Sequence, residues 1–423
     1  MTIPPILQKI SDRLATEGAV AVLVGGCVRD HYLGLPVKDY DVEVYGLEKI
    51  EALERILAEF GRTKAVGKSF GVLKLIHESG EYDFAFPRKE RKIASGHRGF
   101  AVETDGSLDF QEAARRRDFT INAMGYLIGE HRFLDPFGGR ADLERKILRH
   151  IDAGTFVEDP LRVYRGVQFA ARFALEIDPR TEQLCRRMVA QGMLEELPKE
   201  RIFEEIKKLL LQASRPSIGF VLMRRMGILD DYPCLLTQGE DRWRQMLERL
   251  DMMALLRPAD RKKGLTLMLA ALCMGCAEAS VRAMLAYWSD ERKLIDGVAA
   301  LTAHAGEIES IAHDPAHADT RLRKLALEAE IADLIEVAKA DYLARHPDRH
   351  RFEAGERVAQ RARSLGVLHH ALSPLIQGRD LIALGMAPSP KFKAILERLY
   401  QLQLEGEIRS RAEALAYLER GSL

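Results

Sequence analysis

The stretch that decides the fold is "LVGGCVRDHYLGLPVKDYDVEVYG", residues 23–46. It is typical of a strand that ends in two glycines, a short helix and then a second strand, on which Asp39, Asp41 and Glu43 alternate with apolar and aromatic residues. Residues two apart on a strand share a face at a spacing of about 6–7 Å. That spacing lets two carboxylates coordinate a pair of divalent cations about 4 Å apart. A solvent-facing acidic strand is the alternative.

Composition predicts a multidomain globular protein. With 423 residues the chain is too long for one ordinary core, and its 47% hydrophobic and 30% charged content is that of a soluble protein. The N-terminal segment has no signal-peptide core, and the most apolar stretch, 265–277, is shorter than the roughly 20 residues that span a bilayer. We therefore expect no membrane association. Five scattered cysteines argue against a disulfide framework and for a cytoplasmic location.

Strands and helices are expected to mix in the first 150 residues. The pattern predicts strands at 19–26 and 38–46, a helix at 48–60, and a hairpin of 70–77 with 81–88. From residue 151 apolar residues recur at helical spacing and convincing strand patterns disappear. Sixty-three bases balance sixty-three acids, so nucleic-acid binding would have to come from local basic patches.

Three further features favour a metal and phosphate site over a bland acidic strand. "GGCVRD" (25–30) offers glycines that let the backbone approach a phosphate at a helix start, although a tight turn is the simpler reading. Asp83 in "EYDFAFPR" adds a carboxylate that an antiparallel sheet could direct to the same site, or it is a hairpin surface residue. "RRRDFTINAM" (115–124) combines arginines suited to triphosphate oxygens with Asp118 and Asn122, which suit a ribose hydroxyl; a charged helix start is the alternative.

Together these features resemble the nucleotidyltransferase superfamily and, more closely, the class II tRNA nucleotidyltransferases, a family that also contains the bacterial poly(A) polymerases. Five motifs occur in the family's order, and residues 378–418 resemble its C-terminal region. The motifs are "LVGGCVRDHYLGLPVKDYDVEVYG", "RRDFTINAM", "LDPFGGRADL" (134–143), "EDPLRVYRGVQFAARF" (158–173) and "LPKERIFEEIKKLL" (197–210).

The resemblance implies an α+β fold, with a polymerase-β-like nucleotidyltransferase head that has a small mixed sheet. All-helical neck, body and tail domains would follow. The expected ranges are 1–150 for the head, 151–215 for the neck, 216–370 for the body and 371–423 for the tail.

The resemblance also implies roles for individual residues. Asp39 and Asp41 would hold two Mg²⁺ ions, with Asp83 as a third catalytic carboxylate and Glu43 in a structural role. One ion would activate the primer's 3′-hydroxyl, and the other would stabilise the triphosphate as pyrophosphate leaves. The nucleotide-binding residues would be Gly25, Gly26, Arg29 and Arg117 at the phosphates and Asp118 and Asn122 at the ribose.

Base selection would depend on "EDPLR". In the family the Asp and Arg of this motif read the incoming base without a template, which assigns these roles to Asp159 and Arg162, with Arg165 assisting one turn later. C and A both present an amino donor beside a ring acceptor, so this pair favours CTP and ATP. Asp159 followed by Pro160 is also a good helix cap, and the local sequence leaves both readings open.

The sequence indicates less clearly which member of this family the chain resembles most. The loop-like "RKERKIASGHRGF" (88–100) argues against an enzyme that adds only CC, and "GKSFGV" (67–72) is closer to tRNA-specific members than to poly(A) polymerases. His313-Asp314 lacks the context of a metal-dependent HD phosphohydrolase, so the body is expected to be a scaffold.

The leading hypothesis is addition of CCA, or of its terminal A alone, to tRNA. The helical remainder would bind the acceptor and TΨC arm through its phosphates. The alternatives are a poly(A) polymerase that acts on diverse RNA and a catalytically silent RNA-binding relative. The sequence gives no oligomeric state.

Overall fold

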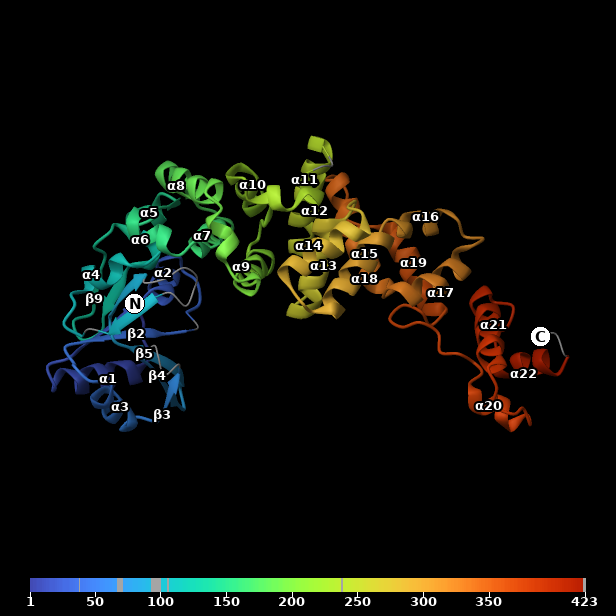
Figure 1. Cartoon of the computed structure of the whole chain (residues 1–423), viewed down its shortest axis with the longest axis horizontal. Helices are drawn as coiled ribbons and strands as arrows, with labels where there is room; N and C mark the ends of the chain where they lie inside the picture. The colour runs from blue at the N-terminus through green and yellow to red at the C-terminus, as the bar shows by residue number, and fades with distance from the viewer. Residues whose placement is uncertain (38, 67–70, 93–99, 105, 237–238, 421–423) are drawn as a thin grey trace. The chain divides into compact units, whose positions relative to one another are not determined.

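A computed structural model of the chain is α+β, with one mixed sheet near the N-terminus and helices throughout the remainder (Figure 1). This confirms the predicted fold class. The residues that the structure describes are 1–37, 39–66, 71–92, 100–104, 106–236 and 239–420. The middle of the predicted loop (93–99) and most of the stretch 67–72 lie outside them.

Eleven strands occur in the described residues. They are β1 (Val20–Val24), β2 (Asp41–Tyr45), β3 (Arg62–Val66), β4 (Val72–His77), β5 (Gly80–Ala85), β6 (Arg88–Lys92), β7 (Phe100–Thr104), β8 (Gly125–Leu127), β9 (Arg132–Leu134), β10 (Ile147–Leu148) and β11 (Glu176–Ile177).

The helices of the N-terminal half alternate with these strands along the chain and continue after them. They are α1 (Pro5–Ala15), α2 (Gly26–Tyr32), α3 (Ile50–Ala58), α4 (Phe110–Arg115), the 3₁₀ turn η1 (Thr120–Asn122), α5 (Gly139–Glu144), α6 (Ala153–Glu158), α7 (Leu161–Phe173), α8 (Pro179–Ala190), η2 (Met193–Glu196), α9 (Lys199–Gln212) and α10 (Ser217–Met226).

The described residues of the C-terminal half form helices joined by loops, with no strand among them. Its elements are η3 (Ile228–Asp231), α11 (Pro233–Leu236), α12 (Gly239–Leu256), α13 (Arg261–Cys273), α14 (Glu278–Trp288), α15 (Arg292–His304), α16 (Glu307–His313), α17 (Ala318–Glu328), α18 (Ile331–Arg345), α19 (Glu353–Ser364), α20 (Gly378–Ala383), α21 (Lys391–Glu405) and α22 (Arg411–Glu419).

The main sheet has seven strands in the order β3-β4-β5-β2-β1-β8-β9. Neighbouring strands are antiparallel except β2 and β5, which are parallel. The hairpin of β4 and β5 was predicted, but it enters the sheet through this parallel pairing with β2, so the antiparallel setting expected for Asp83 was wrong there.

Two sequence expectations about local structure need correction. The strand predicted over 38–46 begins at Asp41, so Asp39 precedes the strand instead of alternating along it. The stretch 88–100 was expected to be a loop, yet β6 and the start of β7 pair as antiparallel strands within it. In this pairing Arg88 lies opposite Thr104 and Lys92 lies opposite Phe100.

Burial follows the sequence pattern closely in the first two strands. In β1, "VAVLV", four of the five residues are buried, and Val42 and Val44 of β2 point into the same core. Helix α1 contacts β1 and α3, and α3 contacts β3 and β4.

The chain divides into two compact units. Unit 1 comprises residues 1–209 and 218–228, and unit 2 comprises 210–217 and 229–423. The four-part division into head, neck, body and tail stays a prediction. No helix among the described residues is both long and apolar enough to cross a bilayer.

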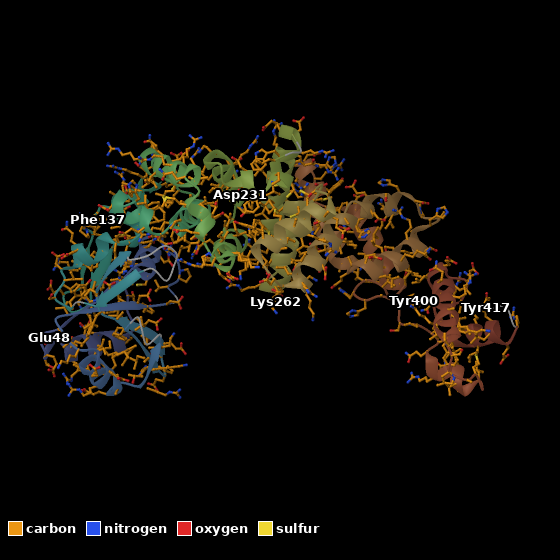
Figure 2. The ribbon with its side chains drawn as sticks, in the orientation of Figure 1. Glu48, Phe137, Asp231, Lys262, Tyr400 and Tyr417 are labelled. Atoms are coloured by element: carbon orange, nitrogen blue, oxygen red, sulfur yellow. The ribbon has the colours of Figure 1, made fainter. Side chains whose placement is uncertain are left out.

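A buried ion pair and a small separate core stabilise unit 2. Arg249 donates to Asp341 at 2.9 Å and to the carbonyls of Ala271 and Met274. The C-terminal helices α20–α22 have their own apolar cluster, in which Tyr417 packs (Figure 2). Tyr400 of α21 donates its hydroxyl to the carbonyl of Leu372, which ties this cluster to the chain before it.

Candidate active site

A group of carboxylates lies where β2 begins. Asp41 is the first residue of β2 and is paired in the sheet with Asp83 of β5, so the two side chains are neighbours. Asp39 is exposed two residues earlier. Desolvation raises the pKa of Asp41, Arg117 opposes this rise, and the charges of Asp83 and Asp39 add to it. The predicted acids are therefore close enough to repel one another.

In their present orientation the acids provide only part of a metal-binding site. No group of three or more His, Cys, Asp or Glu residues in the described parts of the chain has the geometry of a metal site. Asp83 has a buried Oδ1 with no hydrogen-bond partner among the described residues, and Lys74 lies 3.3 Å from that oxygen. Asp39 and Asp41 thus remain the candidate metal ligands, and Lys74 forms an ion pair with the third acid, Asp83.

Glu43, the last acid of the alternating series, is a buried counter-ion. Its carboxylate accepts hydrogen bonds from Arg117 at 2.9 Å, Arg116 at 3.2 Å and the hydroxyl of Tyr45 at 2.7 Å. Burial alone would raise the pKa of Glu43, but Arg117 and then Arg116 lower it below its ordinary value. The structural role expected for Glu43 is confirmed, and its partners are the arginines expected at the phosphates.

The turn between β1 and α2 depends on glycine. Gly25 has φ +73° and ψ −125°, a conformation that L-residues rarely adopt. A Cβ at this position would also lie 2.9 Å from Nη1 of Arg117. Because Val24 pairs with Asp41, the turn lies beside the carboxylates. Gly26 begins α2 directly after it.

The residues expected at the ribose form a chain of hydrogen bonds. Arg29 donates to Asn122 Oδ1 at 2.7 Å, and Asn122 Nδ2 donates to Asp118 Oδ1 at 2.9 Å. That oxygen also accepts from the amide of Phe119 at 2.8 Å. Oδ2 of Asp118 accepts from Nε of Arg165 at 2.8 Å, and Nη2 of the same guanidinium lies 2.6 Å from this oxygen in an ion pair. Three protein donors thus bond to the Asp118 carboxylate, two at Oδ1 and one at Oδ2.

Two aromatic rings of α7 support the arginines, a feature that the sequence reasoning missed. The Arg29 guanidinium lies 4.6 Å from the ring centre of Phe173 and 5.3 Å from that of Phe169, and Arg165 lies 5.1 Å from Phe169. Arg29 also forms an ion pair with Asp30 at 2.6 Å. The four-residue spacing of Arg165 and Phe169 was the available signal, since such residues meet on one helix face.

The pair expected to read the base is engaged with protein groups. Asp159 Oδ1 accepts from the amide of Leu161 at 3.2 Å, and Oδ2 lies 3.4 Å from Arg201 of α9. One oxygen of Asp159 therefore bonds the first amide of α7, although Pro160 is the N-cap residue of that helix. Arg162 donates to two main-chain carbonyls, those of Thr155 and Arg116, at 2.6 Å each.

Arg201 and Glu204 of α9 have different partners. Arg201 contacts Asp159 at 3.4 Å, and Glu204 pairs with Lys207 on the exposed side of the helix.

Four basic residues of unit 2, Lys262, Lys263, Arg345 and Lys391, differ in whether an acid pairs with them. Lys263 and Arg345 are ion-paired, with Asp333 at 2.5 Å and with Asp341 at 2.9 Å respectively. Lys262 is exposed in the first turn of α13 (Figure 2), and Lys391 is exposed at the start of α21. The two exposed lysines are therefore the better candidates for phosphate contacts.

The histidines of the HD dyad region are exposed. His313 ends α16, and its Nδ1 lies 2.6 Å from the carbonyl of Glu309. His317 lies 3.0 Å from Asp314.

Comparison with known proteins identifies the head. Residues 21–149 match the family model described as "Poly A polymerase head domain", and residues 174–235 match "Probable RNA and SrmB- binding site of polymerase A". Over these two ranges the chain is therefore similar to poly(A) polymerases.

Curated relatives match the same half of the chain. The Multifunctional CCA protein of Nitrosomonas europaea is 44% identical over 207 residues, which cover 49% of this chain and 47% of that protein. The Multifunctional CCA protein of Chromobacterium violaceum is 40% identical over 207 residues, which cover 49% and 48%. The chain thus spans about half the length of the curated relatives that it matches.

Solved structures share the fold over almost the whole chain. The Bacillus stearothermophilus CCA-adding enzyme in complex with CTP has a TM-score of 0.72 at 23% identity and covers 99% of this chain and 98% of its own. The Thermotoga maritima CCA-adding enzyme complexed with tRNA has a TM-score of 0.63 at 20% identity, with 98% and 96% covered. At these identities the likeness establishes the fold alone.

Proposed function

We propose that this protein is a template-independent tRNA nucleotidyltransferase that adds CCA, or only its terminal A, to the tRNA 3′ end from CTP and ATP. The observation that carries the proposal is the pairing of Asp41 with Asp83 beside the glycine turn at Gly25. Acids that repel one another next to a glycine turn at a helix start suit a cation and a triphosphate together. The names of the curated relatives and of the solved neighbours support tRNA, CTP and ATP as partners.

Enzymes of this family generally use a divalent metal, and we propose two Mg²⁺ ions held by Asp39 and Asp41. When bound, such ions supply Lewis-acid stabilisation of the phosphates and of the attacking 3′-hydroxyl. The closeness of three acids supports this, since a cation relieves their mutual repulsion. Asp83 would complete the site once Lys74 releases it. We also propose a cytoplasmic location, which the five free cysteines support.

The remaining proposed site residues bind and orient the nucleotide. Gly25 and Gly26 leave the backbone open to phosphate oxygens. Arg117 is fixed by Glu43 at this turn, where its charge offsets that of the phosphates. Arg29 donates to the side-chain oxygen of Asn122, and this orients the Asn122 amide toward Asp118. The two side chains are thereby positioned where the ribose would bind.

We further propose that Asp159 and Arg162 select the base, with Arg165 assisting. Contact of Asp159 with Arg201 and of Arg162 with two carbonyls pre-orients both side chains at the start of α7. The carboxylate accepts from an exocyclic amine, and the guanidinium beside it donates to a ring nitrogen. That arrangement accommodates C and A and leaves U and G with unpaired groups.

The test is a primer-extension assay with each nucleotide supplied separately. The RNAs are tRNAs that end before CCA, after C or after CC, together with an unrelated RNA. The expected result is ordered addition of C and A to the tRNAs alone, and addition only to the CC-ended tRNA identifies an A-adding enzyme. Long A tracts on every RNA would show a poly(A) polymerase instead.

A variant pair tests the metal residues in the same assay. Asp41→Asn should abolish addition, whereas Glu130→Gln, which removes an exposed acid paired with Arg132, should leave it unchanged. Unchanged addition by Asp41→Asn would refute the assigned site. Absence of addition by the wild-type protein on every RNA would favour the silent RNA-binding relative.

A further inference from the structure

Three charged side chains form a row across the outer face of the main sheet, the side opposite its buried core. Lys74 of β4 is directly opposite Asp83 of β5, and Asp83 is directly opposite Asp41 of β2. The next residues along these strands point inward and are buried: Leu73, Phe84 and Val42. Because strand register and this buried layer fix the row, the two acids cannot move apart, and like charges directly opposite each other are destabilising.

Lys74 offsets part of this repulsion. Its Nζ donates to Oε2 of Glu81 at 3.0 Å and lies 3.3 Å from Oδ1 of Asp83. That oxygen of Asp83 is buried, yet it accepts no hydrogen bond from the described residues. Buried polar atoms are nearly always paired, so an oxygen compensated only by a nearby charge calls for an explanation.

Lys74 can leave Asp83 and keep its hydrogen bond. Glu81 lies two residues before Asp83 on β5, so both acids share the outer face of the sheet. Glu81 accepts the hydrogen bond of the ammonium group, whereas Asp83 contributes an ion pair at the longer distance. Arg117 has no such freedom, since Glu43 holds it at 2.9 Å.

We propose that Lys74 is a positioning residue, which stands in for a divalent cation at Asp83 and withdraws to Glu81 when such a cation binds. This rests on the proposed nucleotidyltransferase function, in which Asp83 completes the metal site beside Asp41. The buried, unbonded oxygen of Asp83 and the carboxylate donors of the row fit Mg²⁺, which prefers oxygen ligands. Lys74 thus preserves the arrangement of the acids before the metal arrives, and it lowers their affinity for the metal.

The consequence is that the effect of Lys74 on the sheet depends on the metal. Without a divalent cation, loss of Lys74 leaves Asp41 and Asp83 to repel each other and should loosen β2 and β5. With the cation bound, Lys74 has already left Asp83, so its loss should not change these strands. A purely structural role for Lys74 would weaken the strands by the same factor in both conditions.

The first experiment measures binding of Mn²⁺, a paramagnetic substitute for Mg²⁺, to the full-length protein by electron paramagnetic resonance. Lys74→Met should raise the affinity for Mn²⁺ about fivefold, the upper end for a partly exposed ion pair. Lys74→Arg keeps the charge and should stay within about twofold of wild type. Asp41→Asn should abolish this binding, which would show that the ion binds to the row of carboxylates.

The second experiment measures hydrogen exchange of the β2 and β5 amides in EDTA and in saturating Mg²⁺. Lys74→Met should exchange about fivefold faster than wild type in EDTA and at the wild-type rate in Mg²⁺. Lys64→Met is the matched control for both experiments, because Lys64 is exposed on β3 directly opposite Lys74, one strand further from the acids. It should bind Mn²⁺ within about twofold of wild type.

Three results would overturn the inference. Unchanged Mn²⁺ affinity in Lys74→Met would show that the lysine does not compete with the cation. An equal rise in Lys64→Met would show that general charge, and no contact with Asp83, sets the affinity. Equally faster exchange of Lys74→Met in EDTA and in Mg²⁺ would show a purely structural role. Wild-type protein that adds no nucleotide to any RNA would overturn the proposed function instead, a result that the primer-extension assay gives separately.

Discussion

Removal of the charge of Glu43 should destabilise unit 1 while leaving unit 2 intact. Glu43→Gln conserves volume but removes the counter-charge of two arginines, one of which, Arg117, has a side chain only 19% exposed. Breaking one side of a buried ion pair costs about 3–5 kcal/mol. Glutamine still accepts one hydrogen bond, so we expect the lower end, about 3 kcal/mol.

Hydrogen exchange and fluorescence together separate the two units. A loss of about 3 kcal/mol corresponds to roughly 100-fold faster exchange of the amides of β1 and β2, where opening of unit 1 governs exchange. Both tryptophans of the chain, Trp243 and Trp288, belong to unit 2, so the urea transition followed by tryptophan fluorescence should keep its midpoint. Glu130→Gln, an exposed acid of unit 1, should change neither signal by more than about 0.5 kcal/mol.

Two results would refute this reasoning. Unchanged protection of β1 and β2 in Glu43→Gln would show that the arginines find other partners. A fluorescence midpoint that falls together with the protection would show that the units unfold as one, and the assignment of the effect to Glu43 and its arginines would fail.

Three further predictions concern backbone, pH and the second unit. Gly25→Ala should raise KM for the nucleotide at least tenfold in steady-state kinetics, because its Cβ would lie 2.9 Å from an arginine nitrogen. Gly34→Ala is the control, since a Cβ at this position, at φ +66°, meets no atom within 4 Å. Its KM should be unchanged despite about 1–2 kcal/mol of backbone strain. Burial lowers the pKa of His150 below its ordinary 6.5, so the unfolded chain binds more protons than the folded chain does. Wild-type stability should therefore fall as the pH drops below about 6.5. Urea unfolding followed by circular dichroism should show a smaller fall for His150→Gln. Arg249→Met removes the buried partner of Asp341 Oδ1 and leaves only Arg345 on Oδ2, so it should lower the stability of unit 2 by about 3 kcal/mol in the tryptophan-fluorescence transition, with exchange from β1 and β2 unchanged.

The sequence by itself predicted the elements that carry the site. The glycine pair at 25–26 and the valines of the next strand indicated a strand, a turn and a second strand, and these occur at β1, α2 and β2. The hairpin that presents Asp83 was also predicted. Such features follow from local properties, the alternation of a strand and the conformational freedom of glycine, which any window of sequence carries.

Only the tertiary structure decided which partners the polar side chains take. Asp83 lies opposite Asp41 because β5 pairs parallel to β2, a choice that the sequence pattern leaves open. Arg29 meets Asn122 across 93 residues of chain, and Arg201 reaches Asp159 from a different helix. Alternation and helical spacing specify the face on which a side chain lies. The group that it meets there depends on how distant segments pack, and no local pattern records that packing.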